Sequence, residues 1–278
     1  MKVRLGCRGS ELSMHMAELV TKKLEQLDCT VEIIPIKSDG DIHEDKVIAD
    51  IGGKGVFCSK IEDELFNGNV DIAVHSTKDL PTVMPKELIL AGVLKRNDPR
   101  DCYIGKFFPN AKVGTGSPRR IAQLKLINEH LKATHIRGNI ATRIKKLHSG
   151  EYDAIVLARA GLEILGLEKM IAHTFDFDHM LPAVGQGAIA IQTRTMSPYT
   201  ALVRQINHLD TFYCILAERT ALKFLDGDCH SAVGVLAQIT GDCMTLKAIN
   251  YNNMKDCTVT GKILDYKQIG EKVGTAIK

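Results

Sequence analysis

Hydrophobic and polar positions along the first two thirds of the chain form short β-branched runs that alternate with amphipathic segments. This alternation is typical of α/β proteins with parallel strands. Two stretches repeat the same order of signals, namely "GVFCSKIEDELFNGNVDIAVHS" at 55–76 and "GNIATRIKKLHSGEYDAIVLA" at 138–158. Each stretch begins with a glycine, which is followed by a segment whose apolar residues have helical spacing. The motif Leu-x-x-Gly, an aspartate and an apolar run then follow in this order. Gly68 and Gly150 stand where a helix C-cap belongs, so we predict a helix followed at once by a strand in both stretches.

The segments that precede these stretches also match each other. Residues 3–19 and 111–127 both pass from an apolar run through Gly-Ser into a helix-spaced segment. Two matches in the same order favour two related α/β domains that face each other across a cleft. We expect the chain to cross between them in "KRNDPRD" at 95–101, where Pro99 interrupts the pattern, and to return near 181–193.

The last third of the chain follows a different pattern. Apolar positions over 211–225 have helical spacing, and three β-rich runs follow at 232–240, 243–250 and 257–264, with a closing helix expected over 266–277. The predicted fold class is therefore α/β, with two similar domains that resemble periplasmic binding proteins and form a cleft. The predicted fold also includes a small C-terminal α+β domain with a three-stranded antiparallel sheet. The expected ranges are 1–96 and 188–207 for domain 1, 97–187 for domain 2 and 208–278 for domain 3.

Composition narrows the class of protein. The chain has 278 residues, of which 45% are hydrophobic and 25% charged, and a net charge of +3, as in ordinary globular proteins. The longest apolar runs are far too short for a membrane span, and nothing near the start resembles a signal peptide, so we expect a cytosolic protein. Eight cysteines are scattered without metal-ligand spacing, which predicts mostly free thiols and no metal site. The small, dispersed positive charge argues against nucleic acid as a partner.

Arginines gather at the predicted strand-to-helix turns. In "VGTGSPRR" at 113–120, Ser117 occupies an N-cap position and Pro118 the first helical position, so free backbone N–H groups form an anion cradle. The alternative is a simple capped helix with two solvated arginines. Further arginines at the equivalent strand-to-helix turns favour the anion cradle, because the ends of strands at such turns form the ligand crevice of open α/β sheets. We therefore predict a polyanionic ligand that is bound by the guanidinium groups of the arginines at these turns. These arginines are Arg8, Arg119, Arg120, Arg137 and Arg143.

One acid stands among these cations. "VHSTKDLP" at 74–81 places Lys78 and Asp79 directly after an apolar strand, and Pro81 stiffens the exit. A solvated surface pair is the alternative interpretation. An acid in a basic crevice would hinder anion binding, so Asp79 is a candidate for moving a proton or stabilising a developing cation. The polar and then glycine-rich run 40–57 indicates either a lid that carries Lys54 or an ordinary surface loop.

The motifs "GCRGSELS", "GGKGVF", "VDIAVHSTKDLP", "NDPRD", "GTGSPRR", "IRGNIATR", "LPAVGQGA" and "FLDGDCHSAVG" occur in this order and resemble the porphobilinogen deaminase (hydroxymethylbilane synthase) family. That resemblance spans about residues 3–240. It implies a transferase of haem biosynthesis that joins four porphobilinogen molecules head to tail with loss of ammonia. It also implies growth from a dipyrromethane cofactor held by a thioether to Cys229, in a cytoplasmic monomer.

The resemblance also implies roles for individual residues. Asp79 matches the catalytic acid, and Lys54 lies in the family's mobile lid. The pyrrole carboxylates of cofactor and growing chain would be held by the positions that match the family's binding residues: Arg8, Ser10, Lys78, Thr115, Ser117, Arg119, Arg120, Arg137 and Arg143.

Three features depart from the family pattern. Ile164 replaces an arginine of the usual Gly-Leu-x-Arg-Leu-Gly, so one carboxylate contact is either missing or supplied by another residue, for which Arg159 is a candidate. The cysteine loop carries Asp228 and Ala232 in place of the usual glycine and proline. The C-terminal domain ends soon after its third strand, which suggests an abbreviated final helix.

Two other classes of protein compete with this interpretation. A two-domain anion-binding module would explain the repeat and the arginines, but not Asp79 or a third domain that presents a thiol. A cysteine-dependent hydrolase is disfavoured because Asp228 opposes thiolate formation at Cys229. A permanent anchor needs only one bond-forming event with a strong electrophile, so a protonated thiol on a loop suffices for it.

Overall fold

The computed structural model describes residues 1–38, 58–225 and 231–278, whose contacts group into two compact units. Unit 1 contains Met1–Asn97 and Ala188–Phe212, and unit 2 contains Asp98–Gly187 and Tyr213–Lys278. The chain thus leaves unit 1 after Asn97 and re-enters it at Ala188, within the two predicted crossing segments. The division into three domains, and the cleft between the first two, stay predictions.

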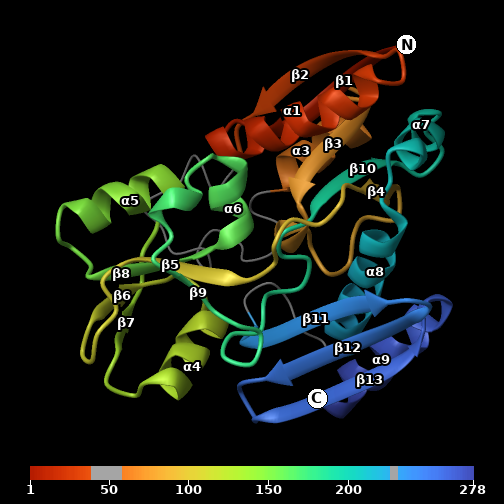
Figure 1. The fold of residues 1–278 in the computed structure, drawn as a ribbon. Helices are drawn as coiled ribbons and strands as arrows, with labels where there is room; N and C mark the ends of the chain where they lie inside the picture. The colour runs from red at the N-terminus through yellow and green to blue at the C-terminus, as the bar shows by residue number, and fades with distance from the viewer. Residues whose placement is uncertain (39–57, 226–230) are drawn as a thin grey trace. The chain divides into compact units, whose positions relative to one another are not determined.

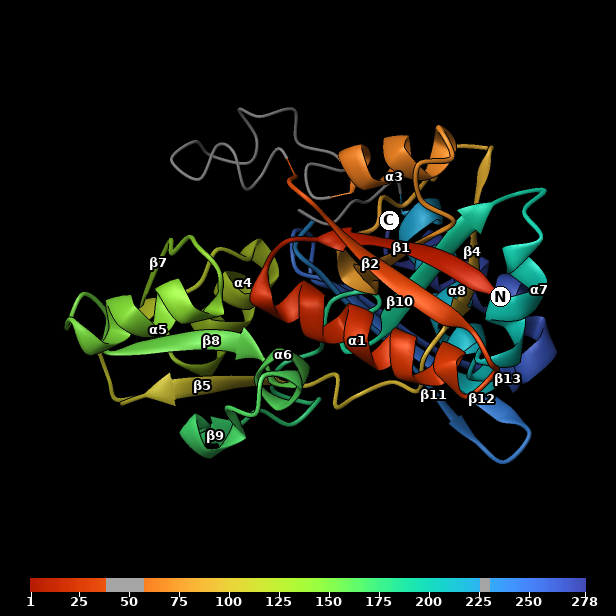
Figure 2. The same ribbon diagram turned by 90° about the horizontal axis from the view of Figure 1, so that it is seen from above.

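Unit 1 is built on a five-stranded mixed sheet in the order β2-β1-β3-β10-β4 (Figure 1). β1 pairs in parallel with β2 and β3, whereas β10 runs antiparallel to β3 and β4. Helix α1 lies along the sheet beside β1 and β2 (Figure 2). The elements of this unit are β1 (Lys2–Arg8), α1 (Glu11–Glu25), β2 (Thr30–Ile36), α3 (Ser59–Phe66), β3 (Ile72–Ser76), η2 (Thr77–Asp79), β4 (Leu88–Val93), β10 (Ile189–Arg194) and α7 (Tyr199–Gln205).

The larger part of unit 2 repeats this topology in the order β7-β6-β8-β5-β9. β6 pairs in parallel with β7 and β8, and β5 runs antiparallel to β8 and β9. Val113 and Val156 pack with Leu124 of α4 on one face, while Ile155 packs with Leu147 of α5 on the other. The elements are β5 (Asp101–Gly105), β6 (Lys112–Gly114), α4 (Pro118–Ile127), β7 (Lys132–Thr134), α5 (Ile140–His148), β8 (Ala154–Ala158), α6 (Arg159–Ile164), η3 (Glu168–Met170) and β9 (His173–Thr174).

The internal repeat extends to individual side chains. Gly68 and Gly150 both follow a helix with positive φ, at 75° and 77°, as expected of C-cap glycines. Asp71 accepts a hydrogen bond from the main-chain nitrogen of Arg4 at 2.8 Å, and Asp153 accepts one from that of Lys112 at 2.7 Å. Each aspartate therefore ties the start of its own strand to the neighbouring parallel strand, which confirms the two related α/β folds predicted from the sequence.

The C-terminal part of unit 2 is a three-stranded antiparallel sheet in the order β11-β12-β13, with one face covered by α8 and α9. The strand β13 begins two residues earlier than predicted, because the preceding turn closes at Met254, whose φ is 57°. Helix α9 has 11 residues and packs closely on α8 through Gly270 and Gly274. The elements are α8 (Leu209–Phe224), whose residues up to Phe212 are grouped with unit 1, β11 (Val233–Thr240), β12 (Cys243–Asn250), β13 (Lys255–Lys262), η4 (Ile263–Asp265) and α9 (Tyr266–Ala276).

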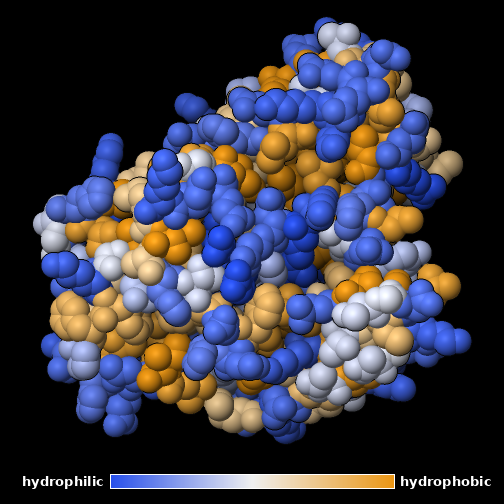
Figure 3. Space-filling view, in the orientation of Figure 1, coloured by the Kyte–Doolittle hydropathy of each residue, from blue (hydrophilic) through white to orange (hydrophobic). Residues whose placement is uncertain are grey.

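The outer surface carries hydrophobic residues in separate patches among hydrophilic ones, on the face drawn in Figure 3. Within the described ranges, no helix has both the length and the apolar character that crossing a membrane would require. The seven cysteines that the structure describes are all free thiols, which confirms the prediction made from their scattered spacing.

Candidate active site

The predicted unit 1 residues lie at one edge of its sheet. β1 and β3 are parallel neighbours with Cys7 opposite Val74, so both strands end at the same edge. Arg8 ends β1, and Ser10 caps α1 by accepting from the main-chain nitrogen of Ser13 at 3.4 Å. Lys78 and Asp79 lie in the short helix η2 that follows β3. The structure thus brings four predicted residues, Arg8, Ser10, Lys78 and Asp79, to one sheet edge.

The main chain around Asp79 is held by several contacts. Thr77 donates to the carbonyl oxygen of Ala188 through its main-chain nitrogen, at 3.0 Å, and its hydroxyl, at 2.9 Å. The Cys58 thiol donates to the main-chain oxygen of Asp79 at 3.2 Å. Asp79 itself is partly exposed, and these contacts hold its main chain at the edge of the sheet.

The second predicted set lies at the corresponding edge of the unit 2 sheet. Ser117 caps α4 by accepting from the main-chain nitrogen of Arg120 at 3.5 Å, and buried Thr115 accepts from that of Ser117 at 3.3 Å. Arg143 donates from Nε to the carbonyl oxygen of Gly138 at 2.8 Å. Arg137 is partly exposed, and its buried NH1 makes no hydrogen bond within the described residues.

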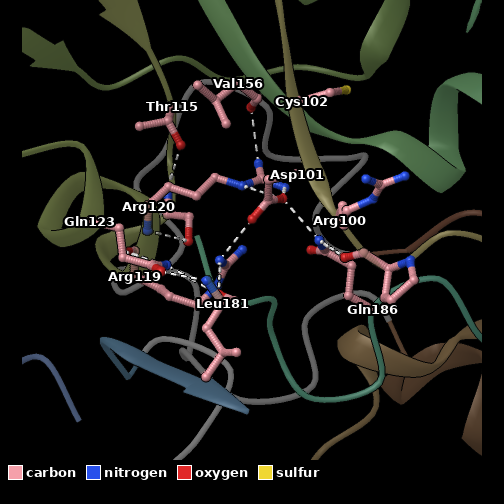
Figure 4. A network of polar contacts seen from close by, with 12 residues as sticks. Arg100, Asp101, Cys102, Thr115, Arg119, Arg120, Gln123, Val156, Leu181 and Gln186 are labelled. Carbon is pink, nitrogen blue, oxygen red and sulfur yellow. Dashed lines mark hydrogen bonds and ion pairs between the residues drawn. The ribbon is translucent and has the colours of Figure 1, made fainter. Parts of the chain in front are cut away.

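Arg119 and Arg120 are buried, with 3% and 5% of their surface exposed, so the alternative of two solvated arginines is wrong. Both contact Asp101, which is fully buried at the start of β5 (Figure 4). Arg119 NH1 lies 2.7 Å from Asp101 Oδ2, and Arg120 donates to Oδ1 from Nε at 3.0 Å and from NH2 at 2.7 Å. Burial alone would raise the pKa of Asp101, but the two guanidinium charges hold it well below its usual range.

Other buried polar groups extend this cluster, and sequence reasoning missed them. Leu181 accepts from Arg119 NH1 at 2.6 Å and from Gln123 Nε2 at 3.1 Å. The Tyr251 hydroxyl, from the turn between β12 and β13, donates to Gln123 Oε1 at 2.7 Å. Burial raises the pKa of Tyr251 to about 12, so its hydroxyl stays protonated and able to donate. The sequence signal was indirect, since Asp101 lies within the "NDPRD" motif, which was interpreted as the segment where the chain crosses between the two domains.

Arg159 is engaged elsewhere in unit 2. It donates from Nε to Glu163 Oε1 at 2.7 Å and from NH1 to Thr174 Oγ1 at 2.9 Å, and Nε lies 3.3 Å from Asp98 Oδ2. These contacts argue against Arg159 as the substitute for the arginine that Ile164 replaces. The remaining two predicted residues, Lys54 and Cys229, fall outside the described residues.

Comparisons with known proteins identify the family. Residues 3–201 match the family model for the porphobilinogen deaminase dipyrromethane cofactor-binding domain, and residues 212–278 match that for the porphobilinogen deaminase C-terminal domain. The chain belongs to the porphobilinogen deaminase family. Its relatives include the porphobilinogen deaminase of Caldicellulosiruptor saccharolyticus, 37% identical over 100% of this chain and 99% of that protein. The porphobilinogen deaminase of Acidithiobacillus ferrooxidans is 42% identical over 89% of this chain and 84% of that protein.

Solved structures show more distant similarity. The VFT2 domain of Bordetella pertussis BvgS aligns with a TM-score of 0.44 and 15% identity over 74% of this chain and 86% of that chain. YhfZ from Shigella flexneri aligns with a TM-score of 0.42 and 16% identity over 80% of this chain and 90% of that chain.

Membership of the porphobilinogen deaminase family confirms the family, the transferase activity and the dipyrromethane cofactor predicted from the sequence.

Proposed function

We propose that this member of the porphobilinogen deaminase family uses its two sheet edges for different tasks. The unit 2 edge holds the carboxylates of the dipyrromethane cofactor and of the growing chain, and the unit 1 edge carries out catalysis through Asp79. The observation that carries this proposal is the buried cluster of Arg119, Arg120 and Asp101. Two guanidinium charges facing one carboxylate leave one positive charge, which a carboxylate of the cofactor can neutralise.

The residues of the unit 2 edge fit a ligand that carries several carboxylates. Arg119 Nε is buried and has no hydrogen-bond partner among the described residues, as is also true of Arg137 NH1. A buried donor without a partner is costly, and an incoming carboxylate oxygen would supply the missing acceptor. We assign cofactor and chain binding in this unit to six residues: Thr115, Ser117, Arg119, Arg120, Arg137 and Arg143.

We assign proton transfer to Asp79. Its fixed main chain and partly exposed position suit a group that must give a proton to a departing amine and then stabilise a positive charge nearby. Arg8, Ser10 and Lys78 share its sheet edge and would bind substrate carboxylates there. Lys54 would contribute from the segment that precedes α3.

We assign covalent attachment of the cofactor to Cys229, which lies between α8 and β11 in the sequence. When bound, the cofactor supplies the free pyrrole position to which the first substrate is joined. The chain's own part is to hold that group in place by one thioether bond and by the unit 2 arginines. We further propose that the protein works as a cytoplasmic monomer, without a nucleic acid partner.

Intact-protein mass spectrometry tests the proposed function. The purified protein should carry one adduct with the mass of a dipyrromethane, and peptide mapping should locate it on Cys229. The Cys229→Ala variant should lack the adduct, whereas Cys243→Ala, which removes an exposed thiol, should retain it. Loaded protein should redden with acidic Ehrlich's reagent. An unmodified Cys229 in active protein would refute the anchor, and an unmodified, inactive protein would favour the anion-binding module instead.

A further inference from the structure

Asp101 stands between two arginines without itself reaching the exterior. Its Oδ1 accepts from both Nε and NH2 of Arg120, and its Oδ2 lies 2.7 Å from Arg119 NH1. Figure 4 shows the carboxylate lying among the two guanidinium groups and the amide of Gln186. With none of its surface exposed, Asp101 can affect a ligand only through the residues that it contacts.

Further contacts fix each member of this cluster. Arg120 donates from NH1 to the carbonyl oxygen of Val156 at 3.0 Å, and Arg119 donates to that of Leu181 at 2.6 Å. Gln186 donates to Asp101 Oδ1 at 2.9 Å and to the carbonyl oxygen of Pro99 at 2.7 Å. The carboxylate is therefore held from the side of β5, and the guanidinium groups are held from β8 and from residue 181. Groups held in this way keep their orientation before any ligand arrives.

The charges of the cluster do not cancel. Each guanidinium group carries one positive charge, and the two together hold the pKa of Asp101 well below its usual range, so the carboxylate is ionised and one net positive charge remains buried. A buried charge without a partner is strongly unfavourable. Without Asp101, two such charges would remain and would repel each other across the first turn of α4.

We propose that Asp101 is a positioning residue for the cofactor's carboxylate site: it sets the orientation of Arg119 and Arg120 and reduces their combined charge to the single charge that one carboxylate neutralises. This inference rests on the proposed function of the unit 2 edge. It adds a residue that acts through the arginines and touches no ligand.

Chemical rescue of cofactor loading tests the proposal. Apoprotein would be produced in cells that make no porphobilinogen and then incubated with porphobilinogen, and the adduct would be followed by intact-protein mass spectrometry. Asp101→Ala should load at least about tenfold more slowly than the wild type, as expected for misplaced charge-assisted hydrogen bonds. Sodium formate, a small carboxylate that fits the vacated space, should restore loading, and sodium chloride at equal ionic strength should not.

Two further variants separate positioning from folding. Asp101→Asn fills the same space without charge, so it should load slowly and should not respond to formate. Asp71→Ala removes a buried aspartate that pairs with Arg4 in unit 1, so it should load like the wild type in either salt. If Asp101→Ala does not fold in chloride, formate should restore its folding as well, measured by thermal unfolding.

The outcomes distinguish this inference from the proposed function. Wild-type loading of Asp101→Ala in chloride would overturn the positioning role while leaving the cofactor site intact. Failure of formate to restore either loading or folding would also overturn it. If the wild-type protein itself forms no adduct, both the proposed function and this inference are wrong.

Discussion

The Cys58 thiol donates a hydrogen bond to the main-chain oxygen of Asp79 at 3.2 Å, and so joins the residue before α3 to the turn that carries the proposed catalytic acid. Cys58 is buried, whereas Asp79 is partly exposed, so this contact is partly buried. A thiol is a weak donor, but here it reaches the backbone of the residue whose carboxylate we propose as the proton donor.

Replacing Cys58 should therefore change turnover more than substrate affinity. A hydrogen bond contributes about 0.5–1.5 kcal/mol, so we expect Cys58→Ala to lower kcat by roughly threefold to tenfold with little change in KM. Cys58→Ser keeps a donor of similar size and should stay within about twofold of the wild type. Steady-state kinetics of the two variants would check this, and equal kcat values for serine and alanine would show that the hydrogen bond does not position Asp79.

Histidine 75 should make the protein sensitive to mild acid. Burial lowers the pKa of His75 from 6.5 to about 4, and its Nε2 makes no hydrogen bond within the described residues. Above pH 6.5 the ring is neutral in both folded and unfolded chains. As the pH falls from 6.5 towards 4, the unfolded chain gains the proton first, so stability is lost in this window by up to about 3 kcal/mol.

The His75→Gln variant should lose this part of the pH dependence. Urea unfolding at several pH values between 7 and 4 would compare its slope with that of the wild type. His130→Gln serves as the matched control, because His130 is exposed and its replacement should leave the slope unchanged. A His75→Gln slope equal to the wild-type slope would contradict the buried neutral ring.

Replacing both cradle arginines should produce protein without cofactor, provided that Asp101 is neutralised with them. Arg119→Leu and Arg120→Leu together would leave the buried Asp101 carboxylate unpaired, which costs about 3–5 kcal/mol and would obscure the result. The triple variant with Asp101→Asn removes that charge, so we expect it to fold and to lack the dipyrromethane mass. A triple variant that carries the dipyrromethane adduct at full occupancy would show that the turn at 113–120 does not bind the cofactor.

Much of the fold could be predicted from the sequence because it depends on local patterns. Gly68 and Gly150 ended their helices as expected, and the period of apolar positions located every strand of the C-terminal sheet within two residues. The candidate residues were also placed at the correct ends of strands. Parallel pairing then brought Arg8 and Asp79 to one sheet edge, a consequence of topology that the alternation of elements already implies.

The environment of Arg119 and Arg120 could not be predicted in the same way. Asp101 belongs to a run of charged residues that, by composition, resembles an exposed turn, yet it is fully buried. Its burial depends on the packing of β5 against β8 and on Gln186, which is 85 residues away in the chain. Long-range contacts of this kind leave no periodic signal, so the sequence showed the arginines without the carboxylate that orients them.

The most direct test of the account is the turnover of Asp79→Asn, which keeps the shape of the side chain and removes its ability to exchange a proton. The variant should carry the dipyrromethane adduct at wild-type occupancy, because the unit 2 arginines are unchanged. Its porphobilinogen consumption should fall by at least about 100-fold, as expected for loss of a general acid. Asp63→Asn, which alters an exposed aspartate on α3, should consume porphobilinogen at the wild-type rate. Consumption by loaded Asp79→Asn within a few-fold of the wild type would contradict the assignment of catalysis to Asp79.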